Sequence, residues 1–239
     1  MHEYSEDENR IQSFADSFLL ELEPCINKIF TDNAVIAKDL VERTGFGKNK
    51  VSVHYQPVDL NVRTPGARKE KNSFKILWAS RVAPQKRPDI LKRIAKALPD
   101  NYTIDVYGRI QKPYFKDNYF AGAKNITYKG AFSNISTLPI DDYDVYLYTA
   151  QTDGIPNILL EITALGLPIV ATNEGGVSDF IEDKKSGRLV ELNDIEGYVD
   201  AIKSIAEQED GAQYVRRAQK RMKENHNWSS YKETVKGDL

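Results

Sequence analysis

Short apolar runs alternate with helical segments over residues 74–190, and this alternation constrains the fold more than any other feature of the sequence. The runs lie at 74–79, 103–107, 126–129, 145–148, 169–172 and 188–190, with helical patterns near 88–98, 156–165 and 177–181. Such runs bury both of their faces when they form parallel strands with helices packed above and below. The sequence therefore predicts an α/β fold: a Rossmann-like, doubly wound parallel sheet.

A shorter α/β pattern comes before this region. Apolar spacing predicts a helix at 10–22 and strands at 28–31 and 50–55, with Asn33 as the N-cap of a helix at 34–43. Residues 57–72 contain prolines and basic residues with little apolar content, which is typical of a solvated linker. Three further helices are predicted after the sheet, at 195–207, at 213–224 and, shorter, from Ser230. With 239 residues, the chain is about one and a half average domains long.

The charge balance and the termini restrict the possible partners and the compartment. There are 33 Lys and Arg residues against 35 Asp and Glu, so the net charge of −2 argues against non-specific nucleic-acid binding. The one cysteine, Cys25, can form no intrachain disulfide, and we expect it to pack within a helix. The acidic, polar N-terminus does not resemble a secretory leader, so we expect a cytoplasmic protein.

The stretch at 153–174 contains a carboxylate in an unusual place. Pro156 suits the first position of a helix and Gly166 suits its end, so Glu161 falls among apolar helical residues. Two interpretations stay open: an exposed glutamate, or an acceptor of hydrogen bonds from a vicinal diol such as a ribose. The helix start at 154–158 is a candidate cradle for a phosphate or a sugar, and Gly175-Gly176 is either a second cradle or a tight turn.

Three basic residues directly follow the predicted strand 74–79. Arg81, Lys86 and Arg87 would lie at the carboxyl edge of the sheet, where α/β proteins bind ligands. They either converge on a diphosphate or belong to a solvated loop. The triplet Asp142-Tyr143-Asp144 has the D-x-D pattern of a metal site, but it directly precedes a strand, and we expect no metal there.

Several motifs resemble those of one enzyme family. They are S-R-V-A-P-Q-K-R-P at 80–88, V-Y-G-R at 106–109, I-T-Y-K-G-A-F at 126–132, Y-D-V-Y-L-Y-T at 143–149 and D-G-I-P-N-I-L-L-E-I-T-A-L-G-L-P-I-V-A-T-N-E-G-G-V-S-D-F-I at 153–181. In this order they look like the donor-binding half of retaining family 4 glycosyltransferases of GT-B architecture. The resemblance covers roughly residues 28–236, and H-N-W-S-S-Y at 226–231 matches the closing helices of the family.

The resemblance implies roles for particular residues. The two acids of the family motif fall at Asp153, beside the transferred sugar, and Glu161, on the ribose; the first is more often glutamate in the family. Arg81 and Lys86 match the cations that hold the diphosphate, and we assign Asp153, Arg81 and Lys86 as catalytic. The remaining substrate-binding positions are Gly154, Asn157 and Ile158 at the helix start, and Arg109 and Gly130 around the base.

The resemblance also implies a reaction and its partners. It predicts transfer of a sugar with retention from a UDP- or GDP-sugar to a saccharide or lipid-linked acceptor, with no metal or other cofactor. Residues 1–56 match only the terminal segment of the acceptor domain, 57–72 a linker and 73–239 the donor domain. We therefore expect transfer to require the missing acceptor domain or a partner chain.

Other outcomes stay open. One alternative is a non-catalytic nucleotide-sugar-binding module, and a weaker one is epimerisation of a nucleotide sugar. The incomplete first domain would leave an apolar strand edge, so a homodimer is a further expectation. Peripheral attachment at the inner face of the membrane is also open.

Overall fold

The larger part of the molecule is a six-stranded parallel sheet. The computed structural model describes residues 17–58, 61–65, 72–111, 119–207 and 211–238. The strand order is β5-β4-β3-β6-β7-β8 and every pairing is parallel. The strands are β3 (Phe74–Ala79), β4 (Tyr102–Tyr107), β5 (Ile126–Gly130), β6 (Val145–Tyr148), β7 (Ile169–Thr172) and β8 (Arg188–Val190). The six predicted strands are thus confirmed, with bounds that differ by one residue at β4 and β5.

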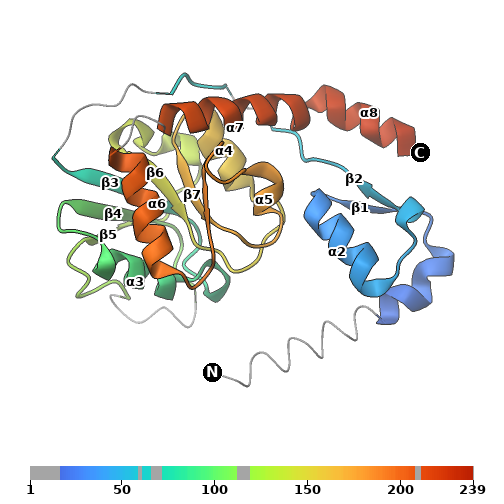
Figure 1. The fold of residues 1–239 in the computed structure, drawn as a ribbon, viewed down its shortest axis with the longest axis horizontal. Coiled ribbons are helices and arrows are strands. Elements are labelled where there is room, and N and C mark those ends of the chain that lie inside the picture. The colour runs from blue at the N-terminus through green and yellow to red at the C-terminus, as the bar shows by residue number, and fades with distance from the viewer. Residues whose placement is uncertain (1–16, 59–60, 66–71, 112–118, 208–210, 239) are drawn as a thin grey trace.

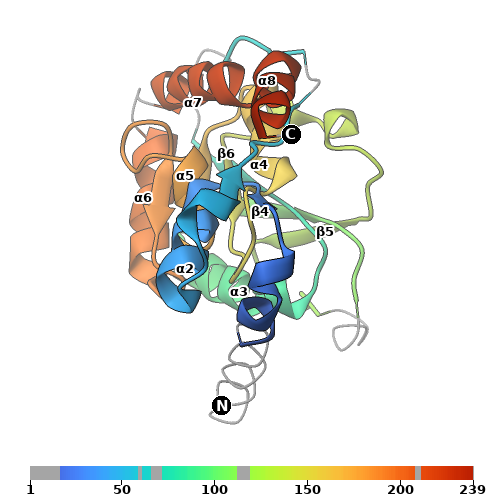
Figure 2. The same cartoon turned by 90° about the vertical axis from the view of Figure 1, so that its right-hand side faces the viewer.

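Helices cover both faces of this sheet (Figures 1 and 2). They are α3 (Pro88–Ala97), α4 (Asn157–Leu165), α5 (Val177–Phe180), α6 (Ile195–Glu207) and α7 (Gly211–Asn225). One apolar core lies under α3 and α6, and a second lies under α4, α5 and α7. Because strands β6 and β7 are buried along their whole length, they carry the contiguous apolar runs that the sequence shows. The doubly wound fold is confirmed.

The order of the strands places two loops at one point of the sheet. The chain runs from β3 outward through β4 and β5, then returns to the other side of β3 for β6, β7 and β8. The loops after β3 and β6 therefore meet at the topological switch point, where open α/β sheets bind their ligands. Gln85 joins these loops, because its carbonyl accepts from Gln151 N–H (2.8 Å) and its side-chain amide donates to Thr152 O (2.7 Å).

A small β-α-β unit precedes the sheet. It consists of β1 (Ile29–Thr31), α2 (Ala34–Thr44) and β2 (Val51–Val53), and the two strands pair in parallel. Asn33 caps α2 as predicted, because its side chain accepts from Ile36 N–H (2.7 Å). Residues 17–22 are helical, while the first part of the predicted helix 10–22 lies outside the described residues. Short 3-10 turns not predicted from the sequence lie at Glu23–Cys25, Lys48–Lys50, Pro84–Lys86, Ile135–Thr137 and Ile140–Asp142.

Contacts from α5 and from the last helix join the small unit to the rest of the chain. The carboxylate of Asp179, in α5, accepts hydrogen bonds from Ala34 N–H (2.6 Å) and from Tyr55 OH (3.0 Å). Burial, followed by the charge of Asp179, raises the pKa of Tyr55 to about 12. The last helix, α8 (Trp228–Asp238), runs back to the small unit, as Figure 1 shows, and Asp238 binds Lys28 (3.0 Å) and His54 (2.8 Å) there.

Some local predictions need correction. The described part of 57–72 is not simply solvated, because Val58 N–H donates to His226 O (3.0 Å) and Arg63 N–H donates to Ala164 O (2.8 Å). The backbone pairs with the larger unit there, which composition alone does not reveal. Cys25 is exposed rather than packed in a helix. Within the described residues, no helix is both long and apolar enough to cross a membrane.

Candidate functional site

Lys86, Asp153 and Tyr148 form a compact polar triad at the switch point. Lys86 ends the turn Pro84–Lys86 after β3, Tyr148 ends β6, and Asp153 lies in the loop that follows β6. The Lys86 ammonium forms an ion pair with Asp153 Oδ2, and the Tyr148 hydroxyl donates to the same oxygen. Lys86 Nζ also lies 3.2 Å from Tyr148 OH and 5.2 Å from the centre of the tyrosine ring. The structure thus brings together Lys86 and Asp153, which the sequence predicted separately.

Burial sets the electrostatics of this triad. Only 12% of the Lys86 side chain and 24% of the Asp153 side chain are exposed, so their opposite charges interact with little screening by water. Burial, and then the hydrogen bond to Asp153, raise the pKa of Tyr148 far above its usual range, so its hydroxyl keeps its proton. The triad therefore carries a lysine, a carboxylate and a neutral phenol.

The amino end of α4 lies directly after the triad. Pro156 is the N-cap and the helix begins at Asn157, one residue later than predicted. No side chain caps it, and within the described residues the backbone N–H groups of Asn157 and Ile158 have no hydrogen-bond partner. Free N–H groups and the helix dipole make this end attractive to an anion. Asn157 is exposed and Ile158 is half-buried.

Glu161 lies one turn further along α4. It is half-buried, and no hydrogen bond or ion pair joins it to any described residue. Burial raises its pKa. A carboxylate that loses water without gaining a partner costs free energy, which a ligand hydroxyl can recover. Because Glu161 is half-buried, its side chain is not fully solvated. That it accepts hydrogen bonds from a vicinal diol stays a prediction.

The other predicted residues lie around the same edge of the sheet. Arg81 lies two residues after the end of β3, and its exposed side chain has no partner in the described part of the chain. Arg109, after β4, is also exposed, and Gly130, at the end of β5, accepts a hydrogen bond from Gly108 N–H through its carbonyl (2.8 Å). The loops after β4 and β5 thus lie together, and within the described residues no hydrogen bond joins Arg109 or Gly130 to the triad.

The glycines of the site accommodate protein backbone and side chains. A Cβ at Gly154 would overlap the carboxylate of Asp32, which accepts from Ile155 N–H at 3.2 Å. Gly175 has φ +59°, and a Cβ there would overlap the carbonyl of Asp153. Gly154 therefore faces the small unit in this structure. Gly175-Gly176 is a turn against the loop of Asp153 and not an open cradle, since Gly176 N–H donates to Asp153 O (3.0 Å).

The D-x-D triplet lies at the other end of the sheet. Asp144 comes directly before β6, at its amino end, and its carboxylate accepts a hydrogen bond from Lys75 N–H at the start of β3 (2.8 Å). The hydroxyl of Tyr143 donates to Asp105 (2.9 Å). The triplet joins neighbouring strands and is separated from the triad by the length of β6, so it belongs to the sheet and not to the site.

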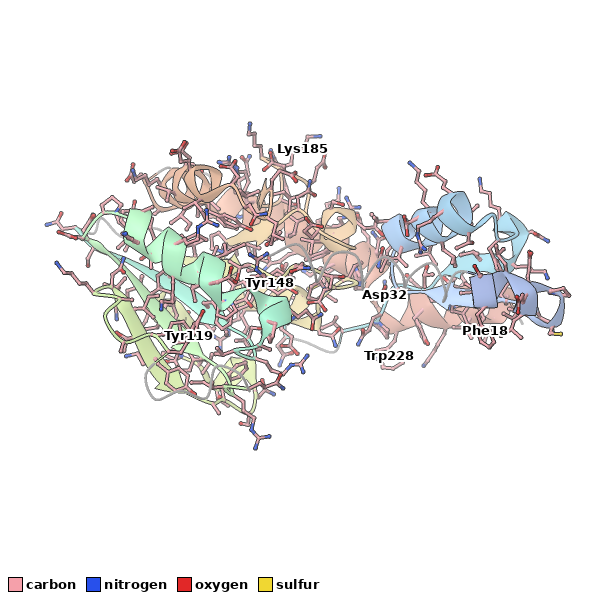
Figure 3. The ribbon with its side chains drawn as sticks, turned by 90° about the horizontal axis from the view of Figure 1, so that it is seen from below. Phe18, Asp32, Tyr119, Tyr148, Lys185 and Trp228 are labelled. Atoms are coloured by element: carbon pink, nitrogen blue, oxygen red, sulfur yellow. The ribbon has the colours of Figure 1, made fainter. Side chains whose placement is uncertain are left out.

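Two polar neighbours of the candidate site, Tyr148 and Asp32, were not found by sequence reasoning. Tyr148 ends the apolar run V-Y-L-Y, and its pattern is that of a core residue. Asp32 precedes the N-cap Asn33, and its position in the sequence indicates only the start of a helix. Figure 3 shows Asp32 where the small unit meets the larger one and Tyr148 within the larger unit. The only available signal was that each ends or directly follows a parallel strand.

The fold, together with the charged residues at the switch point, defines the class of protein. A six-stranded doubly wound sheet with cations and a free helix start at its switch point is the architecture of a Rossmann-like ligand-binding domain. The family model "Glycosyl transferases group 1" matches residues 64–227, which is more than half of the chain. The chain therefore belongs to the group 1 glycosyltransferase family.

Curated relatives are longer than this chain. The UDP-Gal:alpha-D-GlcNAc-diphosphoundecaprenol alpha-1,3-galactosyltransferase of Escherichia coli is 25% identical over 194 residues, which are 77% of this chain and 49% of that protein. The chain spans about half the length of the curated relatives it matches.

Solved structures share the fold. The crystal structure of TarM matches with a TM-score of 0.77 and 22% identity, over 93% of this chain and 45% of that chain. The structure of HepE from Anabaena in complex with UDP matches with a TM-score of 0.75 and 15% identity, over 88% of this chain and 63% of that chain.

Proposed function

We propose that this chain is the donor-binding half of a retaining glycosyltransferase of family 4. In this proposal it binds a UDP- or GDP-sugar at the switch point and contributes to transfer of the sugar to a saccharide or lipid-linked acceptor. The observation that carries the proposal is the convergence of Lys86, Asp153 and the uncapped start of α4 at one edge of the sheet. Family membership supports the same reaction class. A relative named for UDP-galactose and a neighbour with bound UDP favour a uridine nucleotide.

The positive groups at this edge suit the charge that develops during transfer. Breaking the anomeric bond leaves a nucleoside diphosphate, so negative charge grows on the phosphate nearest to the sugar. The Lys86 ammonium, the free N–H groups of α4 and the exposed guanidinium of Arg81 are available to stabilise it. Since these groups supply positive charge themselves, we propose that transfer needs no divalent cation and no other cofactor.

The two acids would contact opposite ends of the donor. Asp153, which pairs with Lys86, would lie at the sugar end, while Glu161, without a partner among the described residues, would accept from the ribose hydroxyls. Arg109 and Gly130 would lie near the base, because their loops flank the same edge.

We further propose that transfer requires an acceptor half beyond residues 1–56. The small unit contributes two strands and α2, and Phe30 of β1 is 50% exposed. A complete acceptor domain would extend the β1–β2 sheet and cover this apolar surface. That half would be supplied by a further segment of a longer protein or by a partner chain; a second copy of this chain is the homodimer alternative.

Isothermal titration with UDP, GDP, UDP-glucose, UDP-galactose and GDP-mannose tests the proposal. We expect one nucleotide series to bind and chelation of metals to leave the affinity unchanged. Transfer should appear only when the acceptor half is supplied. Binding without turnover in any pairing would favour the non-catalytic module instead. Failure to bind every nucleotide at millimolar concentration would refute donor binding altogether.

A further inference from the structure

We propose that Tyr148 is a positioning residue that sets the pose of Asp153 and Lys86 and thereby determines how strongly the site distinguishes a nucleotide sugar from the bare nucleotide. The inference rests on the proposed function, since it concerns the same site. It goes beyond that function because it assigns the sugar discrimination to a buried phenol, Tyr148, to which the sequence analysis gave no functional role.

The geometry of Tyr148 suits this role. It is the last residue of β6 and only 2% of it is exposed, so the strand and the second core hold its ring in place. Its hydroxyl lies against both charged partners: it donates to Asp153 Oδ2 and accepts from Lys86 Nζ at 3.2 Å. A rigid strand residue thus fixes two side chains that belong to loops.

Counting donors and acceptors shows what remains for a ligand. The phenol has one proton, which it gives to Asp153. Lys86 has three, of which one goes to Asp153 and one to Tyr148, so one N–H is left. On Asp153, both hydrogen bonds end on Oδ2, which leaves Oδ1 without a partner among the described residues. The triad therefore offers a phosphate one N–H and a sugar hydroxyl one carboxylate oxygen.

The length of the acidic side chain matches this arrangement. The backbone of Asp153 is held in place, because its carbonyl accepts from Gly176 N–H at 3.0 Å. With the backbone and Tyr148 both fixed, an aspartate reaches the phenol with its carboxylate. One further methylene would push the carboxylate of a glutamate into the phenol oxygen, as overpacking of a filled site does. Tyr148 and Asp153 therefore act as a matched pair.

The test compares Tyr148→Phe with Tyr146→Phe. Tyr146 lies two residues earlier on β6, is equally buried, and donates to Ala79 O (2.9 Å) instead of to the triad. Each variant removes one buried hydroxyl from one strand, so Tyr146→Phe controls for a loss of stability. The measured quantity is the ratio of dissociation constants for UDP and UDP-glucose, and for GDP and GDP-mannose.

We expect Tyr148→Phe to change the affinity for the bare nucleotide less than about threefold. The ratio of dissociation constants, which measures the discrimination between nucleotide sugar and nucleotide, should fall about tenfold, the scale of a lost hydrogen bond to a charged group. Tyr146→Phe should leave the ratio unchanged. If the wild-type chain binds nucleotide and Tyr148→Phe retains the wild-type ratio, the inference is overturned while the proposed function stands. If the wild-type chain binds no nucleotide, both are overturned.

A second comparison tests the matched pair itself. Asp153→Glu alone should lower the discrimination between nucleotide sugar and bare nucleotide. Adding Tyr148→Phe should restore part of that discrimination, because the larger acidic side chain then gains room. Additive losses in the double variant would overturn the match. Circular dichroism of each variant establishes that the comparison is made between folded proteins.

Discussion

Replacing Lys86 by alanine should weaken nucleotide binding more than the loss of one hydrogen bond explains. In the structure the Lys86 ammonium neutralises Asp153, which is only 24% exposed in its side chain. In the proposed donor site, Lys86→Ala removes a donor to the diphosphate and also leaves the charge of Asp153 unopposed beside an anionic ligand. The variant therefore both loses an attraction and gains a repulsion.

The two contributions have comparable sizes. A hydrogen bond from a charged donor contributes about 1.5–3 kcal/mol. Repulsion between unit charges about 8 Å apart amounts to ~2 kcal/mol at an effective dielectric constant of about 20. Lys86→Ala should therefore cost about 3.5–5 kcal/mol of binding free energy. Lys86→Ala/Asp153→Ala removes the repulsion as well, so it should bind better than the single variant, at a cost of about 1.5–3 kcal/mol.

Isothermal titration with the preferred nucleotide diphosphate measures these differences. Lys96→Ala is the control, because Lys96 is an exposed lysine on α3, away from the triad. We expect it to bind like the wild type. Equal affinity of Lys86→Ala and the double variant would show that Asp153 does not face the diphosphate, and the electrostatic reasoning would then be wrong.

Three further substitutions probe other parts of the account. Burial raises the pKa of Glu161, so the native state binds the proton of this carboxyl group more tightly than the unfolded state does. The free energy of unfolding should therefore fall as the pH rises above the usual pKa range of glutamate and the carboxylate ionises. Glu161→Gln should thus raise the midpoint of urea unfolding at pH 7 but not at pH 4. It should also weaken nucleotide binding about tenfold. An unchanged nucleotide affinity would show that Glu161 does not contact the nucleotide. Gly175→Ala forces a Cβ onto Asp153 O at positive φ and should lower the free energy of unfolding by about 2–4 kcal/mol. The control Gly122→Ala also has positive φ (+81°), but its Cβ would meet open space, so it should cost about 1 kcal/mol. Equal costs for the two variants would contradict the overlap at Gly175. Asp179→Ala removes the carboxylate that joins α5 to the small unit and should lower the free energy of unfolding by about 2–4 kcal/mol. Asp141→Ala, at an exposed aspartate, is the control. A loss below about 0.5 kcal/mol in Asp179→Ala would show that the contact contributes little.

The large sheet was predictable because its central strands β6 and β7 are buried on both faces. β6 and β7 have contiguous apolar runs, and Gly166 ends α4 with φ +88° as a left-handed helix end requires. Local patterns of this kind depend only on neighbouring residues. The strands of the small unit were predicted as well, but β2 is shorter than the apolar pattern around it, since a two-stranded sheet has few partners to extend it.

The site was predictable only in part. The rule that ligands bind beyond the carboxyl ends of parallel strands placed Lys86 and Asp153 on one edge, and the structure pairs them. It did not reveal that Lys86 is already neutralised by Asp153, because that depends on the path of two loops. Gly154 was expected to face a ligand, but it packs against Asp32. Such contacts depend on how the small unit meets the large one, which periodicity does not describe.

The position of a bound nucleotide tests the account most directly. A crystal soaked with UDP or GDP should show the diphosphate between Lys86 and the first N–H groups of α4, with the ribose hydroxyls on Glu161. A nucleotide bound elsewhere, or one whose diphosphate lies away from both Lys86 and α4, would contradict the proposed donor site.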